Sequence, residues 1–315
     1  MSTTKEYAHV FPGQGSQFVG MGLELYRSSN AAKEVFDQVD DILATPLTRL
    51  IFEGPEKELE KTINSQPAIM ASSLACLEAV KELHQQDIYL PVALAGHSLG
   101  EYTSLVVSGA LDMADGIRLV RERGRLMQEA SEMRPGSMAA IIGLDEVTIE
   151  EICLETGAEL ANINGGDQIV ISGDRLCVAR AVDMASIRGA RKVIPLAVNG
   201  AFHSSLMAPA QEGLAAAMEG VKFHNPVSLI IANSTSIPLT TAQQVKDELL
   251  NQLCSCVQWK KSVGVMIDLG VSSFIEFGPG RVLAGLIKRI DRSVEALSVF
   301  DPASIQKLVE GAHPS

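Results

Sequence analysis

The feature that most constrains the fold of this chain is an arrangement that occurs twice. A short apolar, β-prone run stops at a glycine-containing tight loop and continues into a helix. In the first case the run is Tyr7–Phe11, the loop reads Pro-Gly-Gln-Gly, and a helix is predicted over Leu23–Asp41. In the second the run is Leu90–Gly96 and a helix is predicted over Glu101–Ser108. Strand, tight loop and helix in this order are typical of parallel sheets, so the pattern predicts an α/β domain.

The middle of the chain has a different order of elements. Strand, helix, strand, strand, helix and strand are predicted at Ser137–Gly143, Glu146–Thr156, Glu159–Ile163, Gln168–Ser172, Leu176–Ile187 and Lys192–Val198. This βαββαβ order is that of a ferredoxin-like module. Elements of α/β type return at Val227–Ile231, Gln243–Leu253, Ser262–Leu269, Ser273–Phe277 and Arg281–Ile290. We therefore expect a ferredoxin-like insert, residues 132–197, in an α/β domain made of residues 1–131 and 198–315, with a cleft at their interface.

The charge balance argues against two classes of partner. The 315 residues are 46% hydrophobic and 20% charged, a globular composition that can bury a large core. They include 26 Lys and Arg against 38 Asp and Glu, for a formal net charge of −12. Such a chain repels phosphate backbones and anionic lipid surfaces unless a local basic patch opposes the total. We expect binding to neither nucleic acid nor membrane.

The cysteines and the amino terminus favour a cytoplasmic protein. Five cysteines are an odd number and include no CxxC pair, which fits neither a disulfide framework nor a zinc ribbon. The first eleven residues contain Lys5 and Glu6 and no apolar signal-peptide segment. No uninterrupted apolar run approaches the roughly 18 residues of a membrane helix. We expect reduced thiols and a cytoplasmic location.

Residues 96–100, Gly-His-Ser-Leu-Gly, match the GxSxG pattern of a nucleophile elbow. In such a turn, small residues permit a sharp bend from strand to helix that exposes the serine hydroxyl. The bend also directs the backbone N–H of Leu99 and the positive helix end toward an oxyanion formed there. Ser98 is therefore a candidate nucleophile. The alternative is an ordinary strand-to-helix turn in which Ser98 caps the helix.

A serine nucleophile needs a base, and six histidines are available. His97 directly precedes Ser98, so its side chain should leave the turn in another direction, and we expect a structural role for it. His203 lies in a loop after the last predicted strand of the insert and before a helix, from which it could face the cleft. The alternative is a partly exposed residue at a helix N-terminus. His203 is the candidate base.

The first glycine loop offers a possible anion site. The dinucleotide fingerprint GxGxxG fails, because Phe18 stands where the third glycine would be, and no GxxxxGK[ST] motif is present. Backbone N–H groups of a glycine-rich loop at a strand end can still face an oxyanion. Neighbouring parallel strands would place this loop beside the elbow, which makes the N–H of Gln14 a candidate second donor. A plain tight turn is the alternative.

Arg123 lies near the middle of an apolar helix face. On a helical wheel that face contains Ile117, Leu119, Val120, Leu126, Met127 and Ala130, and the opposite face carries Arg118, Arg121 and Arg125. An arginine on an apolar face is costly unless an acceptor meets it, so Arg123 either pairs with a protein acid or binds an anionic ligand. Gly124 next to it indicates that another group approaches this face closely.

Five motifs in order resemble the malonyl-CoA:acyl-carrier-protein transacylase family. They are Phe-Pro-Gly-Gln-Gly-Ser-Gln at 11–17, Gly-His-Ser-Leu-Gly-Glu at 96–101, Arg-Gly at 123–124 with Met-Gln at 127–128, Ala-Phe-His-Ser at 201–204 and Gly-Pro-Gly at 278–280. The match extends over about residues 7–290. The resemblance implies an α/β-hydrolase-like large domain with a parallel sheet that carries a ferredoxin-like insert, in agreement with the element pattern.

The resemblance also implies a role for each matched position. The implied nucleophile, base, two oxyanion donors and malonyl carboxylate ligand are Ser98, His203, the N–H groups of Gln14 and Leu99, and Arg123. The family orients its histidine through a backbone carbonyl, and the stretch around Gln258 is similar to the segment that does so. Phe202 resembles the residue of members that select malonyl over branched acyl groups, since its ring fills the space of a methyl branch.

The implied reaction moves malonyl from malonyl-CoA to the phosphopantetheine thiol of acyl carrier protein. It passes through a malonyl-serine intermediate with ping-pong kinetics, needs no metal or redox cofactor, and supplies fatty acid biosynthesis. A stand-alone acyltransferase of polyketide synthesis shares these motifs and stays open. A serine hydrolase or thioesterase, and a carrier-binding scaffold with a degenerate site, are the less favoured alternatives.

The acidic net charge raises a question about the carrier. Acyl carrier protein, as the resemblance implies, is itself strongly acidic, so docking requires basic residues near the cleft. The candidates are Arg188, Arg191 and Lys192 on the insert and Lys288 and Arg289 on the large domain. We hypothesise that the cluster on the insert helps to dock the carrier.

Overall fold

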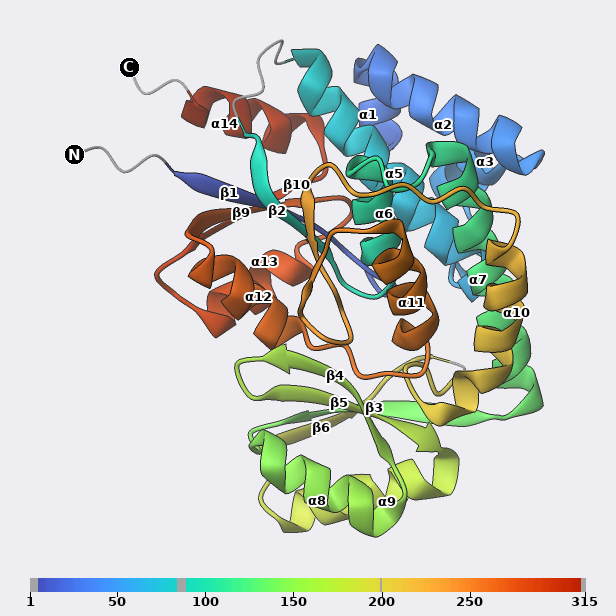
Figure 1. The fold of residues 1–315 in the computed structure, drawn as a ribbon, viewed down its shortest axis with the longest axis vertical. Helices are drawn as coiled ribbons and strands as arrows, with labels where there is room; N and C mark the ends of the chain where they lie inside the picture. The colour runs from blue at the N-terminus through green and yellow to red at the C-terminus, as the bar shows by residue number, and fades with distance from the viewer. Residues whose placement is uncertain (1–4, 84–88, 199, 313–315) are drawn as a thin grey trace.

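The computed structural model describes residues 5–83, 89–198 and 200–312. Two sheets with helices around them make up the fold (Figure 1). The strands are β1 (Glu6–Phe11), β2 (Pro91–Gly96), β3 (Gly136–Ile142), β4 (Glu159–Gly165), β5 (Gln168–Asp174), β6 (Lys192–Pro195), β7 (Leu229–Ile231), β8 (Pro238–Leu239), β9 (Val271–Phe277) and β10 (Glu295–Val299). The helices are α1 (Leu23–Ser28), α2 (Asn30–Leu43), α3 (Leu47–Glu53), α4 (Glu56–Leu59), α5 (Thr62–Leu83), α6 (Leu99–Val107), α7 (Met113–Met133), α8 (Glu146–Thr156), α9 (Arg175–Ile187), the 3-10 helix η1 (Ser205–Met207), α10 (Ala208–Met218), α11 (Ala242–Gln252), α12 (Trp259–Asp268), α13 (Val282–Ile290) and α14 (Pro302–Ala312).

The larger sheet has the strand order β10-β9-β1-β2-β7-β8. Its paired strands run parallel, except that β7 and β8 are antiparallel. β1 pairs with β2 so that Phe11 lies opposite Gly96 at the carboxyl ends of both strands. The glycine loop after Phe11 therefore lies next to the turn after Gly96, as predicted. Ligand sites of parallel sheets form at this edge.

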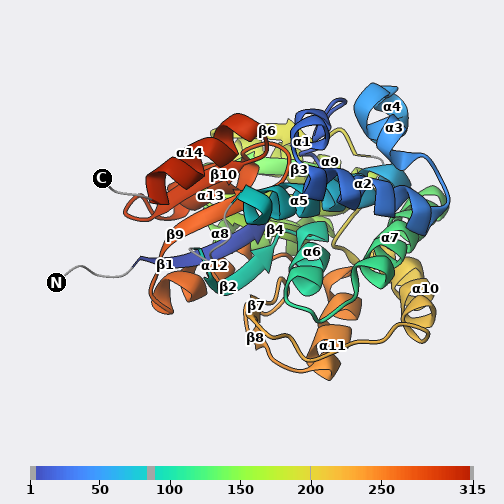
Figure 2. The ribbon, with the colours of Figure 1, turned by 90° about the horizontal axis from the view of Figure 1, so that it is seen from above.

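Helices cover both faces of the larger sheet. Ala8 and Val10 of β1 belong to a core cluster with residues of α12 and α13. Phe11 belongs to the cluster on the other face, with residues of α5 and α6. The strand thus alternates its side chains between two buried layers, which explains its continuous apolar sequence. α5 packs in turn against α2 and α7 (Figure 2).

The long helix α5 was not predicted from the sequence. Its residues from Ser65 to Cys76 are all buried, on every side of the helix. A helix that is enclosed on all sides lacks the apolar periodicity of 3.6 residues by which amphipathic helices are found. The predicted helix over Leu23–Asp41 is interrupted for a different reason, because Ser29 is extended and its side chain caps α2 by accepting from the N–H of Ala32.

The smaller sheet confirms the predicted ferredoxin-like order. Its strands are antiparallel in the order β4-β5-β3-β6, and the chain runs β3, α8, β4, β5, α9, β6. α8 and α9 lie on the side of this sheet that faces away from the large domain (Figure 1). Ile141, Ile149 and Ile171 are fully buried in the core between sheet and helices. The other face of the small sheet, which α8 and α9 do not cover, is therefore turned toward the large domain.

The insert is joined to the large domain along β4. The N–H of Ile163 donates to the carbonyl of Val257 at 2.9 Å, and the N–H of Val257 donates to the carbonyl of Ala161 at 2.8 Å. A Cβ at Gly165 would lie 2.2 Å from a side-chain carbon of Ile290 on α13, so this end of β4 also lies against the large domain. These contacts position β4 beside the elbow.

Candidate active site

Two glycines allow the sharp turn at Ser98. A Cβ at Gly96 would lie 1.9 Å from the carbonyl carbon of Gly100, and a Cβ at Gly100 would lie 2.0 Å from the carbonyl oxygen of Phe11. No side chain fits at either position. Ser98 has a φ of 52° and a ψ of −105°, immediately before α6. Such a conformation costs a residue other than glycine about 1 to 3 kcal/mol and is typical of functional sites. The predicted strand-to-helix turn is therefore present, with the serine at its tip.

Asn233, which follows β7, binds the backbone of the elbow turn after the neighbouring strand β2. Its Oδ1 accepts from the N–H of Ser98 at 2.7 Å, and its Nδ2 donates to the carbonyl of Gly96 at 2.7 Å. These two bonds satisfy backbone groups on both sides of His97 that the turn leaves without ladder partners. Asn233 therefore holds the strained backbone at the elbow.

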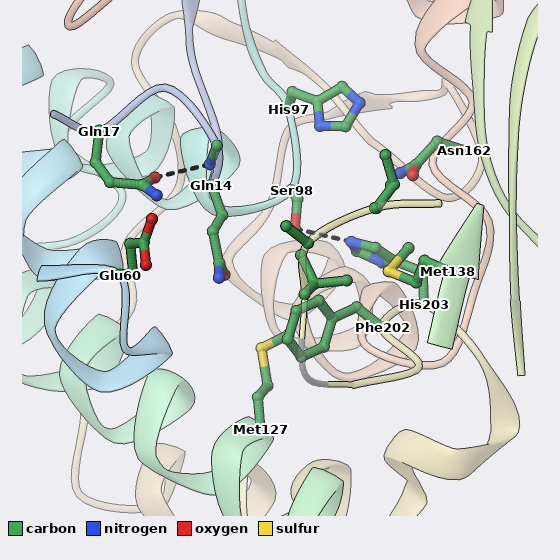
Figure 3. Close-up of a pocket in the computed structure, with 14 residues that line it drawn as sticks. Gln14, Gln17, Glu60, His97, Ser98, Met127, Met138, Asn162, Phe202 and His203 are labelled. Atoms are coloured by element: carbon green, nitrogen blue, oxygen red, sulfur yellow. Dashed lines mark hydrogen bonds between the residues drawn. The ribbon is translucent and has the colours of Figure 1, made fainter. Parts of the chain in front are cut away.

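The Ser98 hydroxyl meets the His203 imidazole (Figure 3). Oγ of Ser98 lies 2.8 Å from Nε2, and Nδ1 lies 2.8 Å from the backbone carbonyl oxygen of Gln252. A carbonyl oxygen can only accept, so Nδ1 carries the proton and Nε2 presents its lone pair to the hydroxyl. The pair is arranged for proton transfer from serine to histidine.

Gln252, and not Gln258, supplies the carbonyl that orients His203. Gln252 is the last residue of α11, where carbonyl groups have no partner within the helix and can turn to other donors. Gln258 precedes α12, its N–H donates to Asn233, and its carbonyl accepts from the Ser236 hydroxyl. The sequence-based assignment of this contact to Gln258 is therefore wrong, because only the folded chain shows which carbonyl faces the imidazole.

Burial changes the protonation of His203. The side chain is 5% exposed. Desolvation, and secondarily the nearby charge of Arg123, lower the pKa of His203 from 6.5 to about 3. The imidazole is consequently neutral at neutral pH, the form in which it can accept the serine proton.

The Arg123 guanidinium reaches the nucleophile from α7. It is 1% exposed, and its Nη2 lies 3.1 Å from Oγ of Ser98 and 2.9 Å from Oε1 of Gln252. Its Nη1 donates to Oε1 of Gln66 at 2.6 Å. Within the described residues Nε has no partner, and no ion pair includes Arg123. Two neutral carboxamides hold this cation, so its charge stays available to an anionic ligand.

Gly124 explains how Gln66 comes within reach of the guanidinium. A Cβ at Gly124 would lie 2.5 Å from the carbonyl oxygen of Thr62 at the start of α5. The bare backbone of α7 therefore lets α5 approach closely, as the sequence indicated, and the approaching group is protein backbone. One turn further along α5, Gln66 faces Arg123.

Ser98 and His203 open onto a cavity of about 400 Å³. Its walls come from the large domain and the insert, and the lining residues include Gln14, Gln17, Glu60, Met127, Phe202, Met138, Asn162 and Leu196. Figure 3 shows the Phe202 ring and Met127 close together below Ser98. The predicted cleft between the two parts of the chain is thus present, with Phe202 in its wall.

Of the two predicted oxyanion donors, Gln14 lies at the edge of this cavity, and Leu99 directly follows Ser98, which lines it. Leu99 is the first residue of α6, where an N–H has no partner within the helix. No acceptor among residues 5–83, 89–198 and 200–312 takes a hydrogen bond from either N–H. Both groups can therefore face an oxyanion on a Ser98-bound acyl group, and their role in doing so stays a prediction.

Comparison with known proteins agrees with this geometry. Residues 8–306 match the family described as acyl transferase domain. The malonyl CoA-acyl carrier protein transacylase of Bacillus subtilis is 42% identical to this chain over 96% of each sequence. This chain belongs to the malonyl CoA-acyl carrier protein transacylase family. The acyl-carrier-protein S-malonyltransferase structure from Bartonella henselae has a TM-score of 0.94 at 40% identity, and the match covers 98% of this chain and 99% of that one. A malonyl-transacylase solved with its type II PKS acyl-carrier protein has a TM-score of 0.93 at 38% identity, over 98% and 100% of the two chains.

Three residues of this transacylase site were missed in the sequence. Gln66, Asn233 and Gln252 are buried polar residues that contact Arg123, the elbow or His203. Gln66 could have been noticed as an amide within an apolar run, because a buried amide needs a partner. Asn233 and Gln252 follow no such pattern, and their partners are distant in the chain.

His97 has the structural position expected of it in this transacylase family member. Its Nε2 lies 2.9 Å from Oδ1 of Asn164 on β4, and its ring centroid lies 5.7 Å from that of Trp259. The side chain therefore points from the elbow to the insert and not to the Ser98 hydroxyl.

The structure also bears on metal ions, membranes and the basic residues proposed for carrier docking. Where the structure describes the chain, no group of three or more His, Cys, Asp and Glu residues could hold a metal ion, and no helix has the length and apolar character to cross a membrane. Arg188 contacts Glu151 and Glu155, and Arg191 contacts Asp167. Two of the proposed carrier-docking cations thus already have acidic neighbours.

Proposed function

We propose that this chain transfers the malonyl group of malonyl-CoA to the phosphopantetheine thiol of acyl carrier protein and so supplies fatty acid biosynthesis. The observation that carries the proposal is the buried guanidinium of Arg123, 3.1 Å from the Ser98 hydroxyl and free of ion pairs in the described part of the chain. A malonyl group on Ser98 has its carboxylate one methylene beyond the ester carbonyl, within reach of that cation. A guanidinium binds a carboxylate with paired hydrogen bonds, so the site favours malonyl over acetyl.

The first half-reaction acylates the enzyme. Nε2 of His203 takes the proton of the Ser98 hydroxyl while Oγ attacks the thioester carbonyl of malonyl-CoA. The tetrahedral oxyanion is bound by the N–H groups of Gln14 and Leu99, and one such donor is typically worth about 2.7 to 4 kcal/mol in the transition state. The carbon–sulfur bond then breaks, and the sulfur of CoA leaves with the proton from His203. The product is a malonyl ester on Ser98.

The second half-reaction reverses these steps with a new thiol. The phosphopantetheine thiol gives its proton to His203 and attacks the ester carbonyl. The ester bond breaks, Ser98 regains its proton, and malonyl leaves as a thioester of the carrier. One acyl bond is exchanged for another without change of oxidation state, so the proposed reaction involves no metal or redox cofactor.

We also assign Phe202 a role in the choice of the acyl group. Phe202 lines the cavity at 8% exposure, where its ring occupies space that a branched acyl group would need.

The five cysteines are all free, as expected in the reducing cytoplasm, where we place the reaction. The Arg123 cation has no evident use in a simple ester hydrolase, which disfavours that alternative.

Intact-protein mass spectrometry after incubation with malonyl-CoA tests the proposal. We expect a malonyl adduct on the wild type and none on Ser98→Ala. For Arg123→Ala we expect the kcat/KM of malonyl-CoA to fall by about 100-fold or more, because a buried charge-assisted pair is lost, while acetyl-CoA is affected far less. A wild type that hydrolyses malonyl-CoA faster than it transfers malonyl to a carrier thiol would contradict the proposal. Comparing carriers from fatty acid and polyketide pathways separates those two destinations.

A further inference from the structure

The side chain of Gln252 connects three groups at the elbow. Its Oε1 accepts from Nη2 of Arg123 at 2.9 Å, and its Nε2 donates to the carbonyl of Ser98 at 2.9 Å and to Oε2 of Glu101. A carboxamide has an accepting end and a donating end of almost the same shape, so its neighbours decide which end faces which group. The orientation of this amide therefore decides whether Arg123 meets an acceptor or a donor.

Glu101 fixes this orientation together with Arg123 and the Ser98 carbonyl. It lies in the first turn of α6 and is completely buried. Its Oε1 accepts from the N–H of Asn233 at 2.9 Å, and its Oε2 accepts from Nε2 of Gln252. Since the Ser98 carbonyl is also an acceptor, the donating end of Gln252 faces two acceptors. Reversing the amide would place acceptor against acceptors and its NH₂ group against the guanidinium.

We infer that Glu101 is a positioning residue for the acyl carboxylate: by fixing the amide of Gln252, it holds the Arg123 guanidinium in the direction of the malonyl group on Ser98. The inference rests on the proposed malonyl transfer. Glu101 makes no hydrogen bond or ion pair with Arg123 among the described residues. The intervening amide therefore orients the cation and leaves it free for the carboxylate of the substrate.

Replacing Glu101 by glutamine gives a near-isosteric test. Glutamine has one accepting and one donating end, and the fixed N–H of Asn233 takes the accepting end. Its NH₂ group then faces the NH₂ group of Gln252, which keeps the Ser98 carbonyl as an acceptor but loses the acceptor that Glu101 supplies. The two NH₂ groups repel each other, so the amide of Gln252 shifts and its hydrogen bond with Arg123 weakens. The backbone carbonyl of Gln252 still orients His203, so acylation of Ser98 by an uncharged acyl group should persist.

The experiment measures Ser98 acylation by malonyl-CoA and by acetyl-CoA as kcat/KM. For Glu101→Gln we expect the malonyl-to-acetyl ratio to fall about tenfold or more, the scale of one charge-assisted hydrogen bond, while the rate with acetyl-CoA is retained. Glu276→Gln is the matched control. Glu276 on β9 is also a buried acid, but its carboxylate accepts from the N–H groups of Leu283 and Ala284 and from the Ser298 hydroxyl, and within the described residues it contacts neither Gln252 nor Arg123, so the ratio should stay at the wild-type value.

A second variant tests whether Glu101 acts through Gln252. Gln252→Leu removes the amide but keeps the backbone carbonyl, so the ratio should fall as in Glu101→Gln. Adding Glu101→Gln to Gln252→Leu should produce no further fall, because the two residues act as one unit. If Glu101→Gln does not fold, the malonyl-to-acetyl ratio of Gln252→Leu still shows whether the amide of Gln252 orients Arg123.

Three results would overturn the inference: an unchanged ratio in Glu101→Gln or Gln252→Leu, an equal loss with both substrates in a folded variant, or additive effects in the double variant. Failure of the proposed function looks different. In that case the wild type itself shows no preference for malonyl-CoA over acetyl-CoA, before any variant is compared.

Discussion

The large domain and the insert bury different kinds of side chain. The core cluster of the insert consists of aliphatic residues and Cys153. The large domain buries Arg123, Glu101, Glu248 and Glu276, each at most 4% exposed. Burying charge costs free energy unless hydrogen bonds offset it, whereas burying aliphatic side chains is favourable by itself. The core of the insert is therefore built from aliphatic packing, whereas the large domain buries charged groups, of which Arg123 and Glu101 lie next to Ser98 or its neighbours.

The insert nevertheless completes the site. Asn162 and Met138 line the cavity, and Asn164 on β4 contacts the elbow through His97. In the proposed reaction all the groups that exchange protons or bind charge belong to the large domain, and the insert supplies walls and one anchoring contact. Substitutions in the two regions should therefore have effects of different kinds and sizes.

The largest effect is expected at the elbow. In Gly96→Ala the new methyl group would lie 1.9 Å from the backbone of Gly100, which cannot move aside as a side chain could. We expect the free energy of unfolding to fall by about 3 kcal/mol or more, and the malonyl-serine adduct to be lost. Denaturant unfolding and mass spectrometry measure the two effects.

Gly264→Ala is the matched control for this substitution. Gly264 lies in α12 with no atom within 4 Å of an added Cβ. Alanine should leave the adduct unchanged and raise stability by about 0.5 to 1 kcal/mol, because it favours the helical conformation. If both variants behaved alike, close packing at the elbow would not be the reason for its glycines.

The next effect concerns acid stability, which the large domain should determine. The insert sequence contains no histidine, whereas β1 contains His9, whose ring nitrogens have no partner among the described residues. Burial lowers the pKa of His9 from 6.5 to about 4. Between these two values the unfolded chain binds more protons than the folded chain, so stability present above pH 6.5 is lost as the pH falls toward 4. The loss from His9 is of the order of 3 kcal/mol.

His9→Leu should remove this part of the pH dependence. We expect the difference in free energy of unfolding between pH 7.5 and pH 5 to become smaller than in the wild type. His203 contributes in the same direction, so part of the dependence should remain. An identical pH dependence in His9→Leu and the wild type would mean that His9 titrates normally in the folded chain. Denaturant unfolding at the two pH values decides this.

A smaller effect is expected where the insert anchors the elbow. Asn164→Ala removes the 2.9 Å contact to His97 and leaves a half-buried imidazole nitrogen without its partner. We expect a loss of about 1 to 2 kcal/mol in stability and a fall of several-fold in acylation by malonyl-CoA and acetyl-CoA alike. Selectivity should stay unchanged, because Arg123 is not disturbed. A changed malonyl-to-acetyl ratio would show that the insert takes part in substrate choice.

The smallest effect is expected on the surface of the insert. Arg188 and Arg191 already contact acidic residues, so their reversal should change carrier docking little, whereas Lys192 makes no ion pair within the described chain. We expect Lys192→Glu to lower the rate with acyl carrier protein a few-fold at low salt, and to leave acylation by malonyl-CoA unchanged. Equal rates with the carrier at low salt would remove this surface from the docking hypothesis.

Much of the architecture followed from local patterns in the chain. The glycine spacing around Ser98 predicted the elbow, and the order of elements predicted both the α/β domain and the βαββαβ insert. An apolar helix face indicated that Arg123 is buried. These features depend on residues close together in the sequence, where periodicity and steric limits act directly on the backbone.

Only the tertiary structure decided which partners surround the reacting groups. It assigned the orienting carbonyl to Gln252 where the sequence suggested Gln258, it brought Asn233 to the elbow, and it revealed the contact between Glu101 and Gln252. Buried polar groups must find partners, but any suitable donor or acceptor that the fold brings near can serve. The choice is made by the packing of segments distant in the chain, and no local pattern records it.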